Sequence, residues 1–330
     1  MTNQHPIGGY FELELTYRGT FPGEDCVLLN SGRNALEYIL RSVQAIERLY
    51  LPYFTCDVVL EPINKLGIPI AWYHIDENLE ISDEIVLGCD DYLLYTNYYG
   101  LKDLYCKHLS NKYKDHLILD NAQAYFSDRI IGVKTFYSPR KYVGIPDGGI
   151  AYCENGMGIR QFTKDQSWER CSHLLKRHDL IPSEGYQDFK ENSKKLKGLD
   201  ICQMSELTKA ILHSIDFNEI KERRKKNYSI LDKEFHSKNL LQLPFDKENN
   251  TPLIYPLWLE NGSEVKKELA KQQIFCATYW PNVLEWCNPK DLEYQLADNI
   301  ICIPIDQRYG EYDMKRIVDT ILLTENEFKR

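Results

Sequence analysis

Two adjacent stretches in the middle of the chain carry the side chains best suited to covalent chemistry. Asp120 and Gln123 follow the apolar run Leu117–Leu119, and Lys141 follows a second candidate strand, Val133–Tyr137. A primary amine can form a Schiff base with a carbonyl compound, and an amine that burial desolvates loses its proton more easily. We therefore predict carbonyl chemistry at Lys141, with a buried acid beside it.

Each of these residues also has an ordinary explanation when it is taken alone. An aspartate at a strand end is most often a helix cap or a turn residue, and a lone lysine is usually a solvated surface charge. The ordered set is more specific than its parts. Ser138 stands three residues before Lys141, and the run Asp147–Gly149 follows the lysine.

Strands of a parallel sheet are expected to position these residues. Leu117–Leu119 is a short apolar run of the kind found in buried parallel strands. Ligands of open α/β sheets bind at the carboxyl ends of the strands, so Asp120 and Gln123 would point into a crevice. Upstream, apolar runs and turn residues predict strands at Leu49–Pro52, Ile68–Tyr73 and Tyr92–Thr96, and helices at Cys56–Lys65 and from Leu101 onward.

The segment around Ser31 predicts a helix whose first turn could bind an anion. Asn30 or Ser31 can cap this helix, and the apolar residues that follow recur at helical spacing: Ala35, Leu36, Ile39 and Leu40. Free N–H groups and the positive end of the helix dipole attract anions. Considered alone, an ordinary capped helix explains the same residues.

These motifs, in this order, resemble the active-site core of the fold type I pyridoxal-phosphate (PLP) enzymes. The likeness is greatest to the sugar aminotransferases of the DegT/DnrJ/StrS family, in which D-x-A-Q-A, a serine, a lysine and G-E-G-G follow one another. Gly148 and Gly149 stand seven and eight residues after Lys141, as in that family. The run Ser31–Leu36 is similar to the S-G-T-x-A-L segment that binds the cofactor phosphate.

The resemblance implies an α/β, aspartate-aminotransferase-like fold (PLP fold type I). Such a fold has a mostly parallel central sheet and a smaller C-terminal α/β domain. We expect a large PLP-binding domain over residues 1–230 and a small domain over residues 231–330. Because enzymes of this fold usually form homodimers, a second copy of the chain is an expected partner.

By the same resemblance, Lys141 and Asp120 are the catalytic residues. Lys141 would hold PLP as a Schiff base and then move a proton, while Asp120 would pair with the protonated ring nitrogen. Gln123 would hydrogen-bond near the ring hydroxyl oxygen. The expected cofactor-binding residues are Ser31, Gly32, Arg33, Cys56, Asp120, Gln123, Ser138 and Lys141.

The phosphate of the cofactor would bind at the start of the Ser31 helix. The resemblance assigns it to the backbone amides of Gly32 and Arg33 and to the hydroxyl of Ser138. The family's own serine stands two residues before Ser138, where this chain has Phe136. Arg33 is also a departure, and its charge could serve either the cofactor phosphate or an anionic substrate.

Further positions depart from the family pattern. Cys56 replaces the aromatic residue that stacks on the pyridine ring, so either Cys56 contacts the ring or Tyr53 or Phe54 replaces that aromatic from one side. Asn97 stands where the family often has histidine. Of the family's N-Y-R-M-S segment, Ile201–Ser205 keeps only Met-Ser, so its contact with the partner's cofactor is not carried over.

The candidate substrate contacts are Asn97, Tyr98 and Arg308. Plain half-buried packing explains Tyr98 equally well. Arg308 follows the apolar run Ile300–Ile305 and could bind a carboxylate or a phosphate. A solvated or loosely paired surface charge is the more common explanation.

The second half of the chain predicts one long helix followed by alternating strands and helices. The amphipathic helix has its apolar positions at Leu207, Ile211, Leu212, Ile215 and Ile220 and continues through the basic run Lys221–Lys226. Further strands are expected in residues 252–259 and 299–305, and helices in 263–274 and 313–323.

Composition excludes several classes of function. A net charge of −9 without a Lys/Arg-rich tail argues against a nucleic-acid partner. The N-terminus lacks a signal pattern and no apolar run could span a bilayer, so a cytoplasmic protein is expected. The ten scattered cysteines predict reduced, mostly buried thiols and no metal site. Cys171, His173 and His178 come nearest to a ligand cluster, but a polar helix surface or loop explains them better.

The sequence thus predicts a PLP-dependent aminotransferase. It would transfer an amino group, with glutamate as the expected donor, to a keto-sugar that is expected to be nucleotide-linked. The alternative is a protein that keeps the PLP site but does not transaminate, either a dehydratase-like enzyme or a binding protein. Dehydratases that resemble this family replace the lysine by histidine, so Lys141 argues against that version.

Overall fold

A seven-stranded sheet forms the centre of the computed structural model, which describes residues 10–19, 25–154 and 156–328. Its strand order is β1-β7-β6-β5-β4-β2-β3, and only β7 runs antiparallel to its neighbours. The strands are β1 (Val27–Leu29), β2 (Arg48–Pro52), β3 (Ile70–Tyr73), β4 (Asp91–Thr96), β5 (Leu117–Asn121), β6 (Lys134–Tyr137) and β7 (Gly149–Tyr152). The expected mostly parallel α/β sheet is confirmed.

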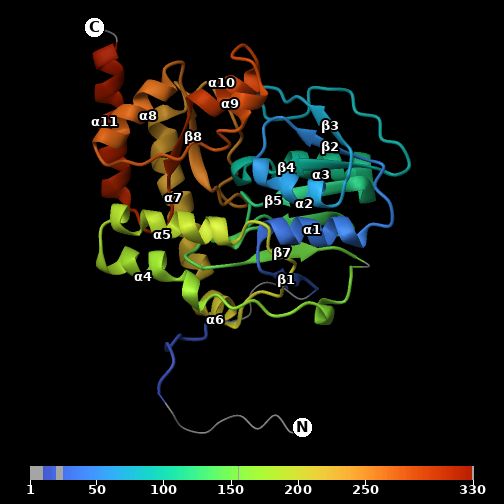
Figure 1. Cartoon of the computed structure of the whole chain (residues 1–330). Coiled ribbons are helices and arrows are strands. Elements are labelled where there is room, and N and C mark those ends of the chain that lie inside the picture. The colour runs from blue at the N-terminus through green and yellow to red at the C-terminus, as the bar shows by residue number, and fades with distance from the viewer. Residues whose placement is uncertain (1–9, 20–24, 155, 329–330) are drawn as a thin grey trace.

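The helices of the first half lie where the apolar spacing predicts them. They are α1 (Gly32–Ser42), α2 (Leu60–Lys65) and α3 (Asp103–Tyr113). Ser31 is the N-cap of α1, because its hydroxyl accepts a hydrogen bond from the Asn34 N–H at 3.1 Å. The helix packs on β7, β6 and β1 and so begins beside the end of β6 (Figure 1).

The alternation of side chains along β5 and β6 decides which face of the sheet carries the candidate site. Ile118 and Phe136 belong to the core beneath α1 and α2, whereas Leu117 and Leu119 belong to the core on the opposite face. Side chains two residues apart on a strand share a face. Asp120 and Ser138 therefore follow Ile118 and Phe136 onto the α1 face.

A second, two-stranded sheet lies beside the first, at the upper left of Figure 1. Its antiparallel strands are β8 (Ile254–Trp258) and β9 (Ile300–Pro304). The helices of this half are α7 (Phe217–Phe235), α8 (Gly262–Lys271), α9 (Val283–Trp286), α10 (Leu292–Asn299) and α11 (Glu311–Phe328). The division into domains at residue 230 stays a prediction, and α7 runs across that position.

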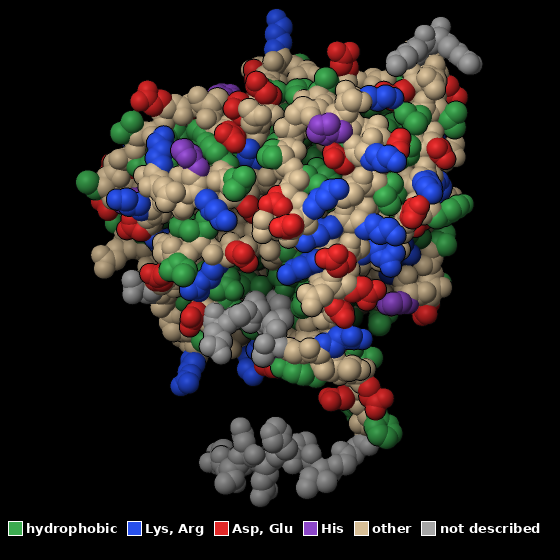
Figure 2. Space-filling view, turned by 180° about the vertical axis from the view of Figure 1, so that it is seen from behind, with side chains coloured by type: hydrophobic (Ala, Val, Ile, Leu, Met, Phe, Trp, Pro, Cys, Tyr) green, Lys and Arg blue, Asp and Glu red, His purple; other side chains and the backbone are tan. Residues whose placement is uncertain are grey.

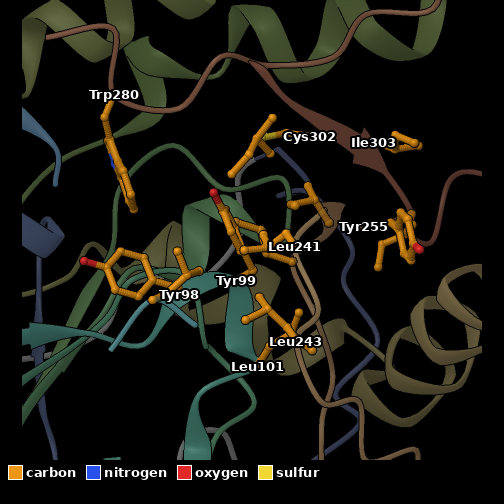
Figure 3. Close-up of a cluster of buried hydrophobic side chains, with 14 of the residues drawn as sticks. Tyr98, Tyr99, Leu101, Leu241, Leu243, Tyr255, Trp280, Cys302 and Ile303 are labelled. Atoms are coloured by element: carbon orange, nitrogen blue, oxygen red, sulfur yellow. The ribbon is translucent and has the colours of Figure 1, made fainter. Parts of the chain in front are cut away.

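One apolar core joins the two sheets. Tyr98, Tyr99 and Leu101, which follow β4, lie in Figure 3 beside Leu241 and Leu243 and near Cys302 of β9. All six side chains are almost completely buried. The burial of these apolar side chains stabilises the packing of one sheet against the other through the hydrophobic effect.

The long helix expected around Leu207–Ile220 is wrong, because the structure has two helices there. Helix α6 (Glu206–Ser214) ends before Ile215, and α7 begins after Asp216, whose carboxylate accepts a hydrogen bond from the Glu219 N–H at 3.0 Å. A side-chain cap of this kind starts a new helix and explains the break. Upstream, α4 (Ser172–Asp179) and α5 (Pro182–Lys195) form a contacting pair in a region of little sequence periodicity.

Basic and acidic side chains are interspersed on one face of the molecule, as Figure 2 shows.

The cysteines agree only partly with the sequence prediction. All ten are free, as predicted. The prediction that most are buried is wrong: Cys106 and Cys302 are buried, Cys89 is exposed, and the other seven are half-buried. In the part of the chain that the structure describes, no helix combines the length and apolar character needed to cross a membrane.

Asp147 is a structural carboxylate. It is completely buried and accepts hydrogen bonds from the Ser205 N–H at 2.9 Å, the Ser205 hydroxyl at 2.7 Å and the Thr208 hydroxyl. These contacts fix the start of α6 beside the Gly148–Gly149 turn. Burial is tolerated because three donors replace the water that the carboxylate loses.

We expect Asp147→Ala to lower the free energy of unfolding by about 2–4 kcal/mol, because it leaves three buried donors unpaired. Chemical denaturation would measure the loss. Asp200→Ala is the matched control, since the Asp200 side chain is 92% exposed and its loss should cost less than about 0.5 kcal/mol. Equal stability of the two variants would contradict the structural role of Asp147.

Candidate active site

A cavity of about 210 Å³ lies on the α1 face of the sheet, at the carboxyl ends of β5 and β6. It is lined by every residue that the sequence nominated for cofactor binding: Ser31, Gly32, Arg33, Cys56, Asp120, Gln123, Ser138 and Lys141. These residues come from four separate segments. The structure thus brings them together, although their roles stay predictions.

The start of α1 meets Ser138 directly. A Cβ added to Gly32 would lie 3.2 Å from the Ser138 Cβ and 3.4 Å from its hydroxyl oxygen. The N–H groups of the first helical turn and a hydroxyl therefore line the same corner of the cavity, which is a suitable place for an anion.

Gly149 makes this corner possible. A Cβ at that position would lie 2.0 Å from the Ser31 carbonyl oxygen, which is far inside van der Waals contact. Gly148 has a φ of +128°, a backbone conformation that other residues rarely adopt. The glycine pair therefore lets β7 approach the residue that caps α1.

Asp120 is a buried carboxylate that accepts one hydrogen bond from the described residues. It is 6% exposed and accepts a hydrogen bond from the Ala122 N–H at 2.8 Å. Burial raises the pKa of Asp120, and the charge of Lys141 and the Ala122 N–H oppose that rise. A cationic group on a bound ligand would stabilise the ionised carboxylate.

Gln123 presents an unused donor at the same site. Its amide oxygen accepts a hydrogen bond from the Tyr99 N–H at 3.1 Å, whereas its buried Nε2 has no hydrogen-bond partner among the described residues. An unpaired buried N–H group is costly, so its presence in a cavity wall fits a ligand that accepts a hydrogen bond.

Lys141 differs from the expectation of a desolvated amine. Its side chain is exposed in the single chain, and its Nζ lies 6.0 Å from the centre of the Tyr279 ring. The reason is its place at the end of a 3₁₀ turn, Pro139–Lys141, at the mouth of the cavity.

The three candidate substrate contacts lie away from this cavity. Asn97 lines a different pocket and donates to Asp103 at 2.7 Å. Tyr98 is completely buried, and its hydroxyl donates to the Phe54 carbonyl at 3.0 Å. Arg308 is paired with Asp306 through hydrogen bonds of 2.7 and 2.9 Å. The structure therefore gives no support to these contacts.

Sequence reasoning missed several residues of the cavity wall. Arg140 adjoins Lys141, Phe189 and Ser193 come from α5, and Trp280 comes from the segment before α9. Of these residues, only Arg140 could have been found from the sequence, because it is next to Lys141 in the chain. No cluster of His, Cys, Asp or Glu with metal-binding geometry occurs within the described residues.

Comparison with known proteins establishes the fold. Neither a protein-family model nor a curated protein sequence matches the chain. The apo form of Spr1654 from Streptococcus pneumoniae matches with a TM-score of 0.63 at 15% identity, over 90% of this chain and 85% of its own. The sugar aminotransferase CalS13 from Micromonospora echinospora matches with a TM-score of 0.59 at 16% identity, over 90% and 86%. DesV from S. venezuelae matches with a TM-score of 0.61 at 17% identity, over 90% and 83%.

The chain therefore has the fold of the sugar aminotransferases, which is PLP fold type I. The fold class predicted from the motifs around Asp120 and Lys141 is confirmed. At these identities, the comparison does not extend to the activity, which has to be argued from the cavity.

We expect Asp120→Asn to stabilise the ligand-free protein at pH 7. The pKa of Asp120 is raised in the folded state, so its ionisation opposes folding at pH 7 and not below the ordinary aspartate pKa of about 3.9. The gain in melting temperature should thus shrink as the pH falls through the raised pKa of Asp120. Asp115→Asn is the control, because the Asp115 side chain is 74% exposed. A gain independent of pH, or one shared with the control, would contradict the role of burial.

Proposed function

We propose that the protein is a PLP-dependent aminotransferase that transfers an amino group from glutamate to a keto-sugar, which we take to be nucleotide-linked. One observation carries the proposal. A single cavity gathers an amine, a buried carboxylate, an unpaired amide donor and the start of a helix, in a fold shared with a sugar aminotransferase.

The cavity residues fit PLP in their chemistry. The start of α1 and the Ser138 hydroxyl suit a phosphate, and the unpaired Nε2 of Gln123 suits the ring hydroxyl oxygen. A protonated ring nitrogen would offset the cost of burying the Asp120 carboxylate. Spr1654, a neighbour in fold, was solved in a PLP form and a PMP form, which supports this choice of cofactor.

The chain's own groups then have distinct tasks. PLP, when bound, supplies an aldehyde carbon and a ring that withdraws electrons. Asp120 keeps a proton on the ring nitrogen, which maintains that withdrawal. The Lys141 amine holds the cofactor covalently and afterwards accepts and returns the proton of the amino donor. Its place at the cavity mouth leaves it accessible to the amino donor.

Trp280 supplies an aromatic face that Cys56 lacks. Both residues line the cavity, and the Asn282 side chain anchors the Trp280 segment by donating to the Thr55 carbonyl at 2.9 Å. The indole packs edge-on against Phe54, with ring centres 4.7 Å apart, and lies near Tyr98 in Figure 3. Trp280 has a φ of +60°, a strained conformation for a bulky residue that a functional site can retain.

We also propose that the protein is a cytoplasmic homodimer with a domain boundary near residue 230, because enzymes of this fold usually form homodimers and have a smaller C-terminal domain. The substituted Cys56 also favours, as a second candidate, a protein that binds PLP without transaminating. The response of the bound cofactor to an amino donor separates the two.

We expect the protein with PLP to show an absorption band at about 400–430 nm that Lys141→Ala abolishes, because the variant lacks the amine that forms the chromophore. Glutamate should shift the band of the wild type toward the shorter wavelength of the amino form. Lys290→Ala, an exposed lysine outside the cavity, is the control and should keep the band. Absence of any band in the wild type would sink the cofactor assignment. A lysine-dependent band that no amino donor shifts would favour the second candidate.

We expect PLP to quench tryptophan fluorescence mainly through Trp280, because this indole lines the cavity. In a titration with PLP, Trp280→Phe should lose the largest share of the quenching. Trp168→Phe is the matched control, since Trp168 is 67% exposed and outside the cavity lining. Equal quenching in both variants would remove Trp280 from the cofactor site.

A further inference from the structure

Arg140 is a cation without a hydrogen-bond or ion-pair partner in the part of the chain that the structure describes. Its side chain is half-buried in the cavity wall, and it makes no hydrogen bond or ion pair with any residue that the structure describes. Its Nε is completely buried and unpaired. Burying a charged, unpaired donor costs free energy that a ligand of opposite charge would recover.

Two other deeply placed arginines, Arg224 and Arg170, also have a buried Nε without a hydrogen-bond partner among the described residues, but each donates through its terminal nitrogens. Arg224, which is 1% exposed, donates to the Leu253 carbonyl at 2.9 Å. Arg170 makes two hydrogen bonds to Asp165, at 2.6 and 3.3 Å. Both guanidinium groups are therefore held by protein acceptors. Arg140 has no acceptor for any of its N–H groups among the described residues, and it lines the cavity that holds Lys141 and Asp120.

Arg33 lies close enough to Arg140 for its charge to lower the pKa of the Arg140 guanidinium. Burial, together with the charges of Arg33 and Arg170, lowers the pKa of Arg140 to about 10, so the guanidinium stays charged at neutral pH. Arg33 itself has only a 3.5 Å ion pair with Glu61, and its Nε makes no hydrogen bond among the described residues.

Two carboxylates lie near this pair, but neither makes a hydrogen bond with Arg140. Glu61 pairs with Arg33, and Asp147 attracts Arg140 while its oxygens accept hydrogen bonds from Ser205 and Thr208. Among the described residues that line the cavity, Asp120 is the only carboxylate and Arg33, Arg140 and Lys141 are cationic. An anion in the cavity would therefore meet the N–H groups of Arg140 that no described residue accepts from.

We propose that Arg140 and Arg33 form a two-arginine site for a phosphate group. Guanidinium groups bind phosphate oxygens through paired hydrogen bonds, and two of them match the two charges of a phosphate monoester better than the single charge of a carboxylate. The Ser138 hydroxyl and the N–H groups at the start of α1 line the same cavity and can complete the coordination.

The phosphate has two possible sources, the cofactor and a phosphorylated substrate. Both sources rest on the proposed function, because the first requires PLP and the second requires an amino acceptor. Binding of inorganic phosphate to the ligand-free protein requires neither and tests the two-arginine site by itself. If the cofactor is the source, Arg140 takes part in holding PLP. If the substrate is the source, Arg140 selects an acceptor that carries a phosphate group.

The test compares the full-length wild type with Arg140→Gln, in a buffer free of phosphate. Arg160→Gln is the matched control, because it removes the same charge from an exposed residue outside the cavity lining. Calorimetry would give the affinity of each ligand-free protein for PLP, for pyridoxal, which lacks the phosphate, and for inorganic phosphate. A second titration would add inorganic phosphate to the PLP-loaded proteins. Melting temperatures without ligand would show that the variant folds.

We expect Arg140→Gln to melt no lower than the wild type, because it removes an unpaired charge. With the cofactor as source, the variant should bind PLP about 10–100-fold more weakly while its affinity for pyridoxal changes less than about twofold. With a substrate as source, PLP affinity should be unchanged and inorganic phosphate should bind the PLP-loaded wild type but not the variant.

The proposal is overturned if Arg140→Gln matches the wild type and Arg160→Gln in all of these titrations. It is also overturned if affinity for PLP and pyridoxal falls equally, since that loss would not involve the phosphate. A wild type that binds neither PLP nor pyridoxal would refute the proposed function. In that case, loss of inorganic phosphate binding in Arg140→Gln would still support the two-arginine site, and unchanged binding would refute it.

Discussion

The close contact between Gly149 and the carbonyl of Ser31 is the constraint on which the candidate site depends. There is no room for a side chain at this point, since a Cβ would lie 2.0 Å from the carbonyl oxygen. The contact joins the antiparallel strand β7 to the residue that caps α1. Because α1 is held there, its first turn faces Ser138 at the end of β6. Asp147, next to the glycines, fixes α6 against the same turn.

The polar and charged groups that line the cavity determine which ligand it can bind. A buried carboxylate, an unpaired amide donor and an unpaired guanidinium all face a space of about 210 Å³. Each of these groups is unfavourable in a protein interior without a partner. Their concentration in one cavity is typical of a site whose ligand supplies the missing charges and hydrogen bonds. Elsewhere, the buried carboxylate of Asp147 accepts its hydrogen bonds from the protein itself.

Local sequence patterns predicted the part of the site that lies on strand ends and on the capped helix. The apolar run before Asp120 and the spacing of Ser138 and Lys141 fix which face of β5 and β6 these residues occupy, because side chains alternate along a strand. The fold class followed from the same motifs. The break before α7 was missed, since the Asp216 cap competes with an uninterrupted apolar spacing.

The rest of the cavity could not be predicted because it depends on contacts between distant segments. Trp280 and Phe189 reach the cavity only through the packing of the C-terminal half and of α5 onto the sheet. The exposure of Lys141 depends on where the 3₁₀ turn meets the surface, which no pattern in the sequence reports. The lack of a partner for Arg140 is likewise a property of the assembled structure and not of its neighbours in sequence.

The position of Trp280 has a consequence for how the protein is made. The cavity floor is encoded between Ser31 and Lys141, yet one of its walls is an indole near the end of the chain, anchored through Asn282 to Thr55. During synthesis, the floor leaves the ribosome long before that wall exists. Contacts between residues so far apart in sequence form slowly, because a long loop must close first. The cavity is therefore complete only after the last quarter of the chain has folded onto the sheet.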